Sequence, residues 1–173
     1  KVLFGDYNPG GRLAVTFPKS VGQVPFAFPF KPGSDSKGRV RVDGVLYPFG
    51  YGLSYTTFEY SALKISKPVI GPQENMTLSC IVKNTGKRAG DEVVQLYIRD
   101  DFSSVTTYDK MLRGFERIHL QPGEEQTISF TLTPQDLGLW DKNNQFTVEP
   151  GSFSIMIGAS SQDIRLKGSF EVQ

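Results

Sequence analysis

The stretch Leu46–Tyr60, LYPFGYGLSYTTFEY, marks the point where the character of this 173-residue sequence changes. Glycine and proline supply 15 of the 60 residues up to its end and 14 of the 113 residues after it. Pro48, Gly50 and Gly52 prevent a regular helix or a central strand within the stretch. Its aromatic side chains carry too much apolar surface for a free linker. We therefore predict a packed junction between two differently built parts.

After the junction, apolar and polar residues alternate with the period of a strand that buries one face. The clearest alternations are Leu78, Cys80, Val82; Val94, Leu96, Ile98; Ile128, Phe130, Leu132; and Phe153, Ile155, Ile157. We expect strands at 58–66, 75–83, 92–99, 111–119, 127–133, 146–148 with a lead-in from 139, 153–158 and 164–172. Short strands separated by Gly, Pro and Asn turns predict an all-β fold, an antiparallel two-sheet sandwich of the immunoglobulin or fibronectin type.

Before the junction, the pattern is weaker. Leu13, Val15 and Phe17 alternate with polar or small residues and predict one strand after a turn at 8–11. Residues 18–44 show neither period, and their prolines suit an extended, Gly/Pro-rich strap that lies over a surface. The start, KVLFGDYNPGG, has neither an initiator Met nor a signal-peptide pattern, so we interpret the sequence as a piece of a longer chain.

The overall composition argues against several classes of function. Lysine and arginine number 19 against 18 acidic residues, without a basic stripe, so we expect no nucleic-acid partner and no anionic membrane surface. No apolar run reaches the length of about 18 residues that a membrane span needs. Cys80 is the single cysteine, which excludes a disulfide framework, and its place in a strand pattern predicts a small buried side chain.

Several side chains invite a catalytic or metal-binding interpretation that their surroundings do not favour. Asp100, Asp101 and Asp109 could form a set of carboxylates, but no calcium-loop spacing is present and a solvated loop explains them. His119 is the only histidine, and we predict a surface residue at a strand edge. The pair at 160–161 is most simply a turn, because no nucleophile-elbow motif surrounds it.

Two further features have simple structural explanations. Thr133 and Pro134 suit the cap and the first position of a short helical turn. Trp140 follows this turn, and we expect its ring to plug one end of the sandwich. The pattern Asn75-Met76-Thr77 fits a glycosylation acceptor, which we attribute to chance.

Five motifs in order resemble the C-terminal end of family 3 glycoside hydrolases, the β-glucosidase and β-xylosidase group. They are NPGGRLAVTFP (8–18), LYPFGYGLSYTTFEYS (46–61), VKNTGKRAGDEVVQLYIRD (82–100), LRGFERIHLQPGEE (112–125) and VEPGSFSIMIGASS (148–161). The resemblance implies that residues 1–17 are the last strand of an α/β sandwich domain otherwise absent here, 18–55 a linker, and 56–173 a fibronectin type III-like domain. Ala14 and Thr107–Tyr108 depart from the common family pattern.

The same resemblance implies that this sequence is catalytically silent. In the family, the nucleophile is an Asp on a barrel and the acid/base is commonly a Glu of the α/β sandwich domain, both upstream of Lys1. We therefore expect no catalytic, cofactor-binding or metal-binding residue here, and contact with a glycoside only through the parent enzyme. The family's habits also imply a periplasmic or extracellular location.

The expected role is to buttress the upstream catalytic domains of the same polypeptide. Four side chains are expected to pack between domains: Tyr47, Phe49, Tyr51 and Tyr55. The strand at 13–17, without its own sheet, should pair with an edge of the sandwich or exchange with another copy. One alternative is a carbohydrate-binding or adhesion module with an exposed row of rings from Tyr47, Tyr51, Tyr55, Tyr97, Tyr108 and Trp140. Another is a secreted interaction domain without sugar chemistry.

Overall fold

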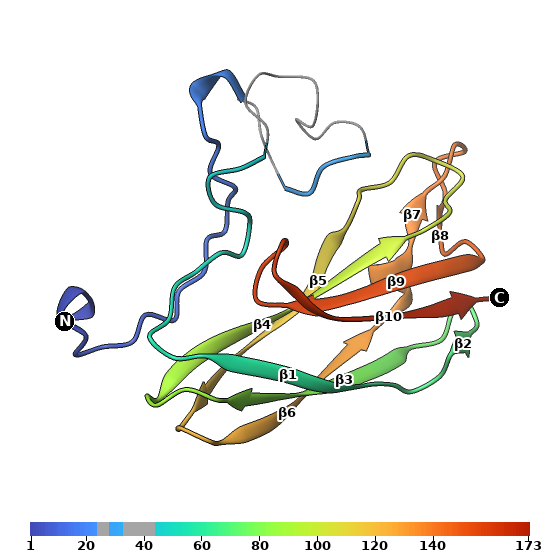
Figure 1. Cartoon of the computed structure of the whole chain (residues 1–173). Coiled ribbons are helices and arrows are strands. Elements are labelled where there is room, and N and C mark those ends of the chain that lie inside the picture. The colour runs from blue at the N-terminus through green and yellow to red at the C-terminus, as the bar shows by residue number, and fades with distance from the viewer. Residues whose placement is uncertain (24–27, 33–43) are drawn as a thin grey trace.

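The computed structural model describes residues 1–23, 28–32 and 44–173, and its main body is a β-sandwich (Figure 1). One sheet has three strands in the order β1-β3-β6, and the other has five in the order β2-β10-β9-β4-β5. Their bounds are β1 Phe58–Ile65, β2 Val69–Ile70, β3 Met76–Asn84, β4 Gly90–Asp100, β5 Met111–Leu120, β6 Glu125–Leu132, β9 Gly151–Gly158 and β10 Ile164–Val172. The remaining elements are the helix α1 (Pro134–Leu137), the paired strands β7 (Leu139–Trp140) and β8 (Phe146–Thr147), and two 3₁₀ turns at Val2–Phe4 and Val21–Gln23.

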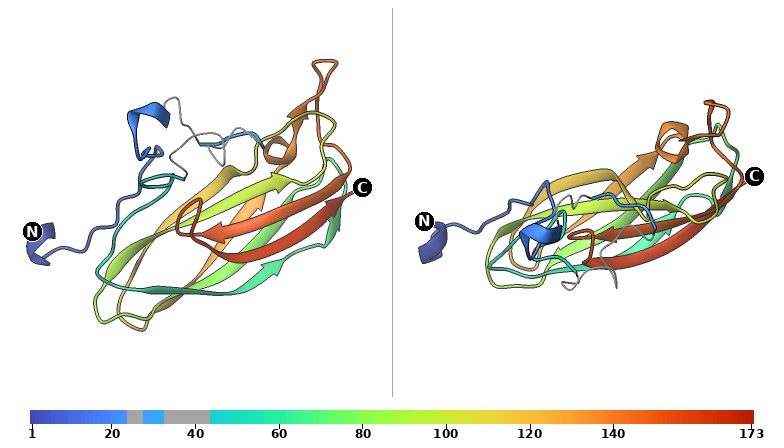
Figure 2. Two further views of the ribbon diagram at one scale, coloured as in Figure 1. Left: turned by 45° about the horizontal axis from the view of Figure 1, so that its top comes forward. Right: turned by 90° about the horizontal axis from the view of Figure 1, so that it is seen from above.

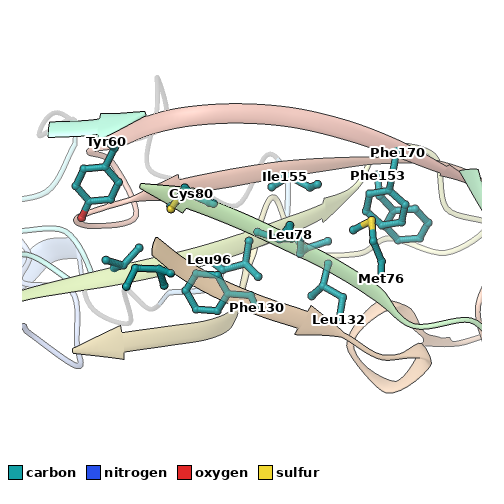
Figure 3. Packing of buried hydrophobic residues seen from close by; sticks show 14 of the residues in the cluster. Tyr60, Met76, Leu78, Cys80, Leu96, Phe130, Leu132, Phe153, Ile155 and Phe170 are labelled. Carbon is teal, nitrogen blue, oxygen red and sulfur yellow. The ribbon is translucent and has the colours of Figure 1, made fainter. Parts of the chain in front are cut away.

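The core lies between the two sheets and is built from the alternating residues (Figure 3). Leu78 and Cys80 of β3 are each 1% exposed, and they face Leu96 of β4, which is fully buried. At one end, the rings of Phe153 and Phe170 stack with centroids 5.3 Å apart. Each large side chain buried in this way contributes about 1.5–3 kcal/mol, so the alternation itself specifies the sandwich.

The structure confirms the all-β sandwich and the strands expected from the period-two pattern. The helical turn also forms where expected, with Thr133 donating from its backbone N–H and its hydroxyl to Asp136 Oδ2, at 2.8 Å each. The sequence pattern missed β2, a two-residue strand that pairs in parallel with β10. The expectation for Trp140 was wrong: its side chain is 65% exposed on β7, and Leu137 of α1 is buried instead.

The strand expected at 13–17 does not form, because no sheet is present beside it. Its backbone bonds with the junction: Leu13 N–H donates to Tyr51 O, and Phe17 N–H donates to Tyr47 O, both at 2.8 Å. Only the Phe17–Tyr47 pair forms a β-bridge. The partner is therefore the junction and not an edge of the sandwich; strand exchange with another copy stays a prediction.

We call the described residues before β1 the N-terminal arm, namely 1–23, 28–32 and 44–55. The segment before residue 23 and the segment 44–55 run side by side away from the start of β1, as both Figure 1 and Figure 2 show. Part of the predicted strap lies outside the described residues. None of the helices in the described part of the chain has the length and apolar character needed to cross a membrane.

Candidate interdomain docking site

The arm lies against the outer face of the five-stranded sheet. In β4, Val94, Leu96 and Ile98 point into the core, so Gln95 and Tyr97 belong to the opposite face. Both are nevertheless buried, at 3% and 0% exposure. An outer sheet face becomes buried only when another part of the chain covers it, and here the cover is the arm.

Gln95 ties the junction to the sheet. Its Nε2 donates to Gly50 O at 3.2 Å and to Ala159 O at 2.6 Å, while its Oε1 accepts the hydroxyl of Tyr97. Gly50 has a φ of +80°, and a Cβ there would lie 2.1 Å from Gln95 Oε1. Glycine is therefore required at this position both by backbone conformation and by space.

Aromatic rings fill the space beside this tie. Phe28 stacks on Phe49 with centroids 4.6 Å apart and meets the ring of Tyr97 edge-on at 5.7 Å. Burial raises the pKa of the Tyr97 hydroxyl, which stays neutral and hydrogen-bonded to Gln95. Phe28 is thus the ring that meets the sandwich, and Phe49 packs behind it.

A buried ion pair makes the second attachment. Arg12 Nη2 donates to Glu92 Oε1 at 3.0 Å, and the two side chains are only 10% and 3% exposed. The same oxygen accepts the Tyr60 hydroxyl at 3.1 Å, and the Arg165 guanidinium lies 4.8 Å from the centre of the Tyr60 ring. Burial, reinforced by the negative charge of Glu92, raises the pKa of Tyr60. Charged groups so far from water need this pairing to be tolerated.

Asn8 makes the third attachment, nearer the start of the chain. Its Oδ1 accepts the Tyr55 backbone N–H at 2.7 Å, and its Nδ2 donates to Ser54 Oγ at 3.1 Å and to Ala89 O at 3.3 Å. Arg88 Nη1 donates to Gly5 O at 2.8 Å. Polar contacts therefore hold the arm along much of its length.

The other side of the arm is apolar and open. Eleven of the seventeen exposed large hydrophobic side chains among the described residues belong to the arm as a whole: Val2, Leu3, Phe4, Tyr7, Val15, Phe17, Val21, Leu46, Tyr47, Leu53 and Tyr55. Some of them border a groove of about 680 Å³ lined by Pro9, Gly11, Arg12, Leu13, Phe17, Tyr47, Tyr51, Gly52 and Leu53. An apolar surface of this extent is typical of a site that another protein surface covers.

The four predicted packing residues differ in their exposure. Phe49 and Tyr51 are half-buried, whereas Tyr47 and Tyr55 are 40% and 47% exposed. Tyr47 and Tyr51 stack on each other with centroids 4.9 Å apart. Because Tyr97 is buried and this stacking occupies a face of each ring, the arrangement does not favour the row of open rings expected of a carbohydrate-binding module.

The carboxylates considered above serve local structure. Asp101 accepts the hydroxyls of Ser152 and Ser154 and lies 3.3 Å from Arg99 Nε. Asp100 ends β4, and burial raises its pKa, with a further contribution from the nearby Glu149. Asp109 lies 3.9 Å from the Lys110 ammonium. Within the described ranges, no group of three or more His, Cys, Asp or Glu side chains could hold a metal ion.

The histidine and the serine pair also have structural roles. His119 lies exposed on the edge strand β5, as expected, with Nδ1 2.6 Å from Asp91 Oδ1. Hydrogen bonds with Arg117 and His119 hold the pKa of Asp91 below its usual value, although burial alone would raise it. Ser160 lies in the turn between β9 and β10, where its Oγ accepts two backbone N–H groups.

Sequence reasoning missed Arg12, Glu92 and Gln95 as the residues that fasten the arm. One signal was present: Glu92 continues the alternation of Val94, Leu96 and Ile98, which places a charged residue at a core-facing position. A charge on a buried face predicts a buried partner. The identity of that partner, 80 residues away, could not be read from the pattern.

Two protein-family models match parts of the chain. Residues 1–55 match the model of the glycosyl hydrolase family 3 C-terminal domain, and residues 92–161 match that of the fibronectin type III-like domain. The chain corresponds to the C-terminal part of the family 3 glycoside hydrolases.

Curated relatives align along nearly the whole chain. A β-xylosidase of Formosa agariphila is 48% identical over 96% of the chain, and a periplasmic β-glucosidase of Salmonella typhimurium is 43% identical over 99% of it. The alignment covers 24% of each relative, so this C-terminal part spans about a quarter of their length.

Solved structures give the same match in three dimensions. A β-glucosidase from Erythrobacter marinus superposes with a TM-score of 0.93 at 43% identity, covering 99% of this chain and 23% of that one. A β-glucosidase from Listeria innocua in complex with isofagomine superposes with a TM-score of 0.87 at 32% identity, covering 99% and 25%.

Proposed function

We propose that this chain is the non-catalytic C-terminal part of a longer family 3 hydrolase of β-linked glycosides, and that it buttresses the catalytic domains. The names of the relatives, β-xylosidases and β-glucosidases, support the substrate class. A periplasmic relative supports action in the periplasm or outside the cell. The chemistry itself would be performed by residues upstream.

The observation that carries this proposal is the two-sided arm. One side is fixed to the sandwich by Gln95, by the Arg12–Glu92 pair and by the bond from Asn8 to Ala89 O. The other side presents the groove beside Phe17, Tyr47 and Leu53. Because the arm is already fixed to the sandwich, its open surface can dock on a neighbouring domain with little loss of conformational entropy. It would thereby keep the sugar site of the longer enzyme in register.

The chain's carboxylates support a silent role. Retaining glycoside hydrolysis needs two carboxyl groups about 5 Å apart on either side of the scissile bond. Asp101 is engaged with Ser152 and Ser154, and Glu92 with Arg12. These groups fasten the structure, so catalysis is expected only when the upstream domains are present.

A matched pair of surface variants in the longer hydrolase tests the proposal. Leu53 on the arm and Phe115 on the sandwich are 65% and 66% exposed, so Leu53→Asp and Phe115→Asp are comparable changes. We expect Leu53→Asp to lower the Tm of the longer enzyme by several degrees, because a charge would be buried at the domain contact. Its kcat/KM per folded molecule should change less than about twofold.

The controls make the outcome specific. Phe115→Asp should leave the Tm of the longer hydrolase unchanged. Leu53→Asp should leave the Tm of the isolated 173-residue chain unchanged, because the Leu53 side chain is exposed in it. Equal Tm values for the two variants of the longer enzyme would refute docking through the arm.

A further inference from the structure

A second hollow lies where the arm meets the sandwich, beside the apolar groove. This cleft has a volume of about 670 Å³, within the range of about 300–1,000 Å³ that is typical of small-molecule sites. Arg12 and residues 51–54 line it from the arm, and the start of β1, Glu92 and the β9–β10 turn line it from the sandwich. Its walls include several charged side chains and are more polar than those of the groove.

Glu92 gives the cleft an unused hydrogen-bond acceptor. Its Oε1 accepts from Arg12 Nη2, from the Tyr60 hydroxyl and from Val93 N–H, at 3.0, 3.1 and 3.2 Å. The side chain is 3% exposed. Within the described part of the chain, the hydrogen bonds to the Glu92 carboxylate all go to Oε1, and Glu92 lines the cleft. Oε2 is therefore the acceptor to which a ligand in the cleft can donate.

Ser160 gives the same cleft a donor. Its Oγ accepts the backbone N–H groups of Gln162 and Asp163, at 3.3 and 2.9 Å. A hydroxyl that accepts two hydrogen bonds still has its own O–H to donate. Ser160 is 4% exposed and lines the cleft, so this donor is held in a fixed place.

The charges of the lining select the class of ligand. Arg12 and Arg165 are outnumbered by Glu59, Glu92 and Asp163, which leaves one excess negative charge and disfavours phosphates and carboxylates. An ammonium group would satisfy Glu92 but leave the Ser160 donor unused. A sugar hydroxyl donates and accepts at once, and a pyranose carries several hydroxyls at fixed spacing.

We propose that this cleft binds a neutral monosaccharide, with hydroxyls that donate to Glu92 Oε2 and accept from Ser160. The bound sugar would touch both the arm and the sandwich and so stabilise their contact. The inference does not depend on the buttressing role, because the cleft is formed entirely by this chain.

The direct test is a titration of the ¹⁵N-labelled 173-residue chain, followed by NMR. D-glucose and D-xylose are added up to about 100 mM. Trimethylamine N-oxide is the control, because it stabilises proteins but carries no hydroxyl group. We expect saturable shifts, with a millimolar Kd, confined to amides around the cleft such as those of Gly52, Ala159 and Ser160. Shifts that do not saturate with either sugar, or that trimethylamine N-oxide reproduces, would overturn the proposal.

Two variants separate binding from folding. Glu92→Gln replaces the unused acceptor by an amide and should weaken binding at least about tenfold, whereas Glu116→Gln, the same change at an exposed site on β5, should leave Kd unchanged. Ser160→Ala leaves the Arg12–Glu92 pair intact and should also weaken binding several-fold. This variant tests the site even if Glu92→Gln does not fold. A folded variant of either kind with wild-type Kd would contradict the site.

Discussion

The sandwich and the N-terminal arm differ in where they place their large apolar side chains. The sandwich buries them between two sheets, with Leu96 and Ile155 fully enclosed. The arm exposes most of its own and is held largely by hydrogen bonds and by the Arg12–Glu92 ion pair, with the Phe28 ring against Tyr97. A segment that shows apolar surface while it is fixed by polar contacts is built to meet a further surface. The following variants test this contrast.

The same substitution in both regions should show the largest difference. Leu96→Ala removes a core side chain and should lower the free energy of unfolding by about 3–4 kcal/mol, because a cavity remains. Leu53→Ala, at a 65% exposed site on the arm, should cost less than about 0.5 kcal/mol. Urea denaturation of the two variants measures both. Similar losses would mean that the arm has a core of its own.

The buried ion pair should give the next largest effect. Arg12→Met leaves Glu92 buried without its cation and should cost about 2–3 kcal/mol, below the 3–5 kcal/mol of fully enclosed pairs because the Arg12 side chain is still 10% exposed. Arg117→Met is the control, since Arg117 also pairs with a β4 carboxylate, that of Asp91, but is 57% exposed. We expect little change for the control in the same urea measurement. Equal losses of unfolding free energy in the two variants would mean that the Arg12–Glu92 pair contributes no more than a surface ion pair.

Gly50 tests the attachment of the junction alone. Gly50→Ala should cost about 2 kcal/mol, because the positive φ is unfavourable and the new Cβ would press on Gln95. Hydrogen exchange at the Ser161 amide, which donates to Phe49 O at 3.0 Å, should become faster. Gly11→Ala has nothing within 4 Å of the new Cβ and should leave this amide protected. Unchanged exchange in Gly50→Ala would show that the arm is not fastened there.

The pH dependence of stability should give the smallest effect, and it belongs to the sandwich. Burial raises the pKa of the Cys80 thiol from 9.0 to about 11. The unfolded chain therefore loses this proton at lower pH than the folded chain, so stability falls as pH rises from 9 towards 11. Between pH 9 and 10, Cys80→Ala should give a shallower decline than the wild type, and Ser79→Ala should not, because tyrosine ionisation in the unfolded chain adds the same decline to all three proteins. Parallel declines in urea midpoints would contradict this.

Local pattern was sufficient for the sandwich. The alternation of Leu78, Cys80 and Val82 predicts both a strand and its buried face, because burial on one side of a strand repeats every two residues. The helical turn after Thr133 was also predictable, because Thr133 suits the N-cap and Pro134 the first helical position. Val69–Ile70 escaped notice because two residues cannot display a period.

The arm could not be predicted in the same way. Leu13, Val15 and Phe17 carry a strand pattern, but a strand needs a partner, and the chain offers only the irregular junction. The Arg12–Glu92 pair depends on a contact across 80 residues. Trp140 looked like a core plug because indole is usually buried, whereas its position on the β7–β8 hairpin leaves it exposed. The attachments of the arm could therefore not be read from the sequence, and the packing of its aromatic residues between domains stays a prediction.

The central claim is that the open side of the arm docks on the upstream domains. Hydroxyl-radical footprinting measures side-chain exposure directly and can be applied to the 173-residue chain and to the longer hydrolase. We predict that labelling of Phe17, Tyr47 and Leu53 falls several-fold in the longer enzyme, while that of Phe115 is unchanged. Equal labelling of Phe17, Tyr47 and Leu53 in both proteins would contradict the account.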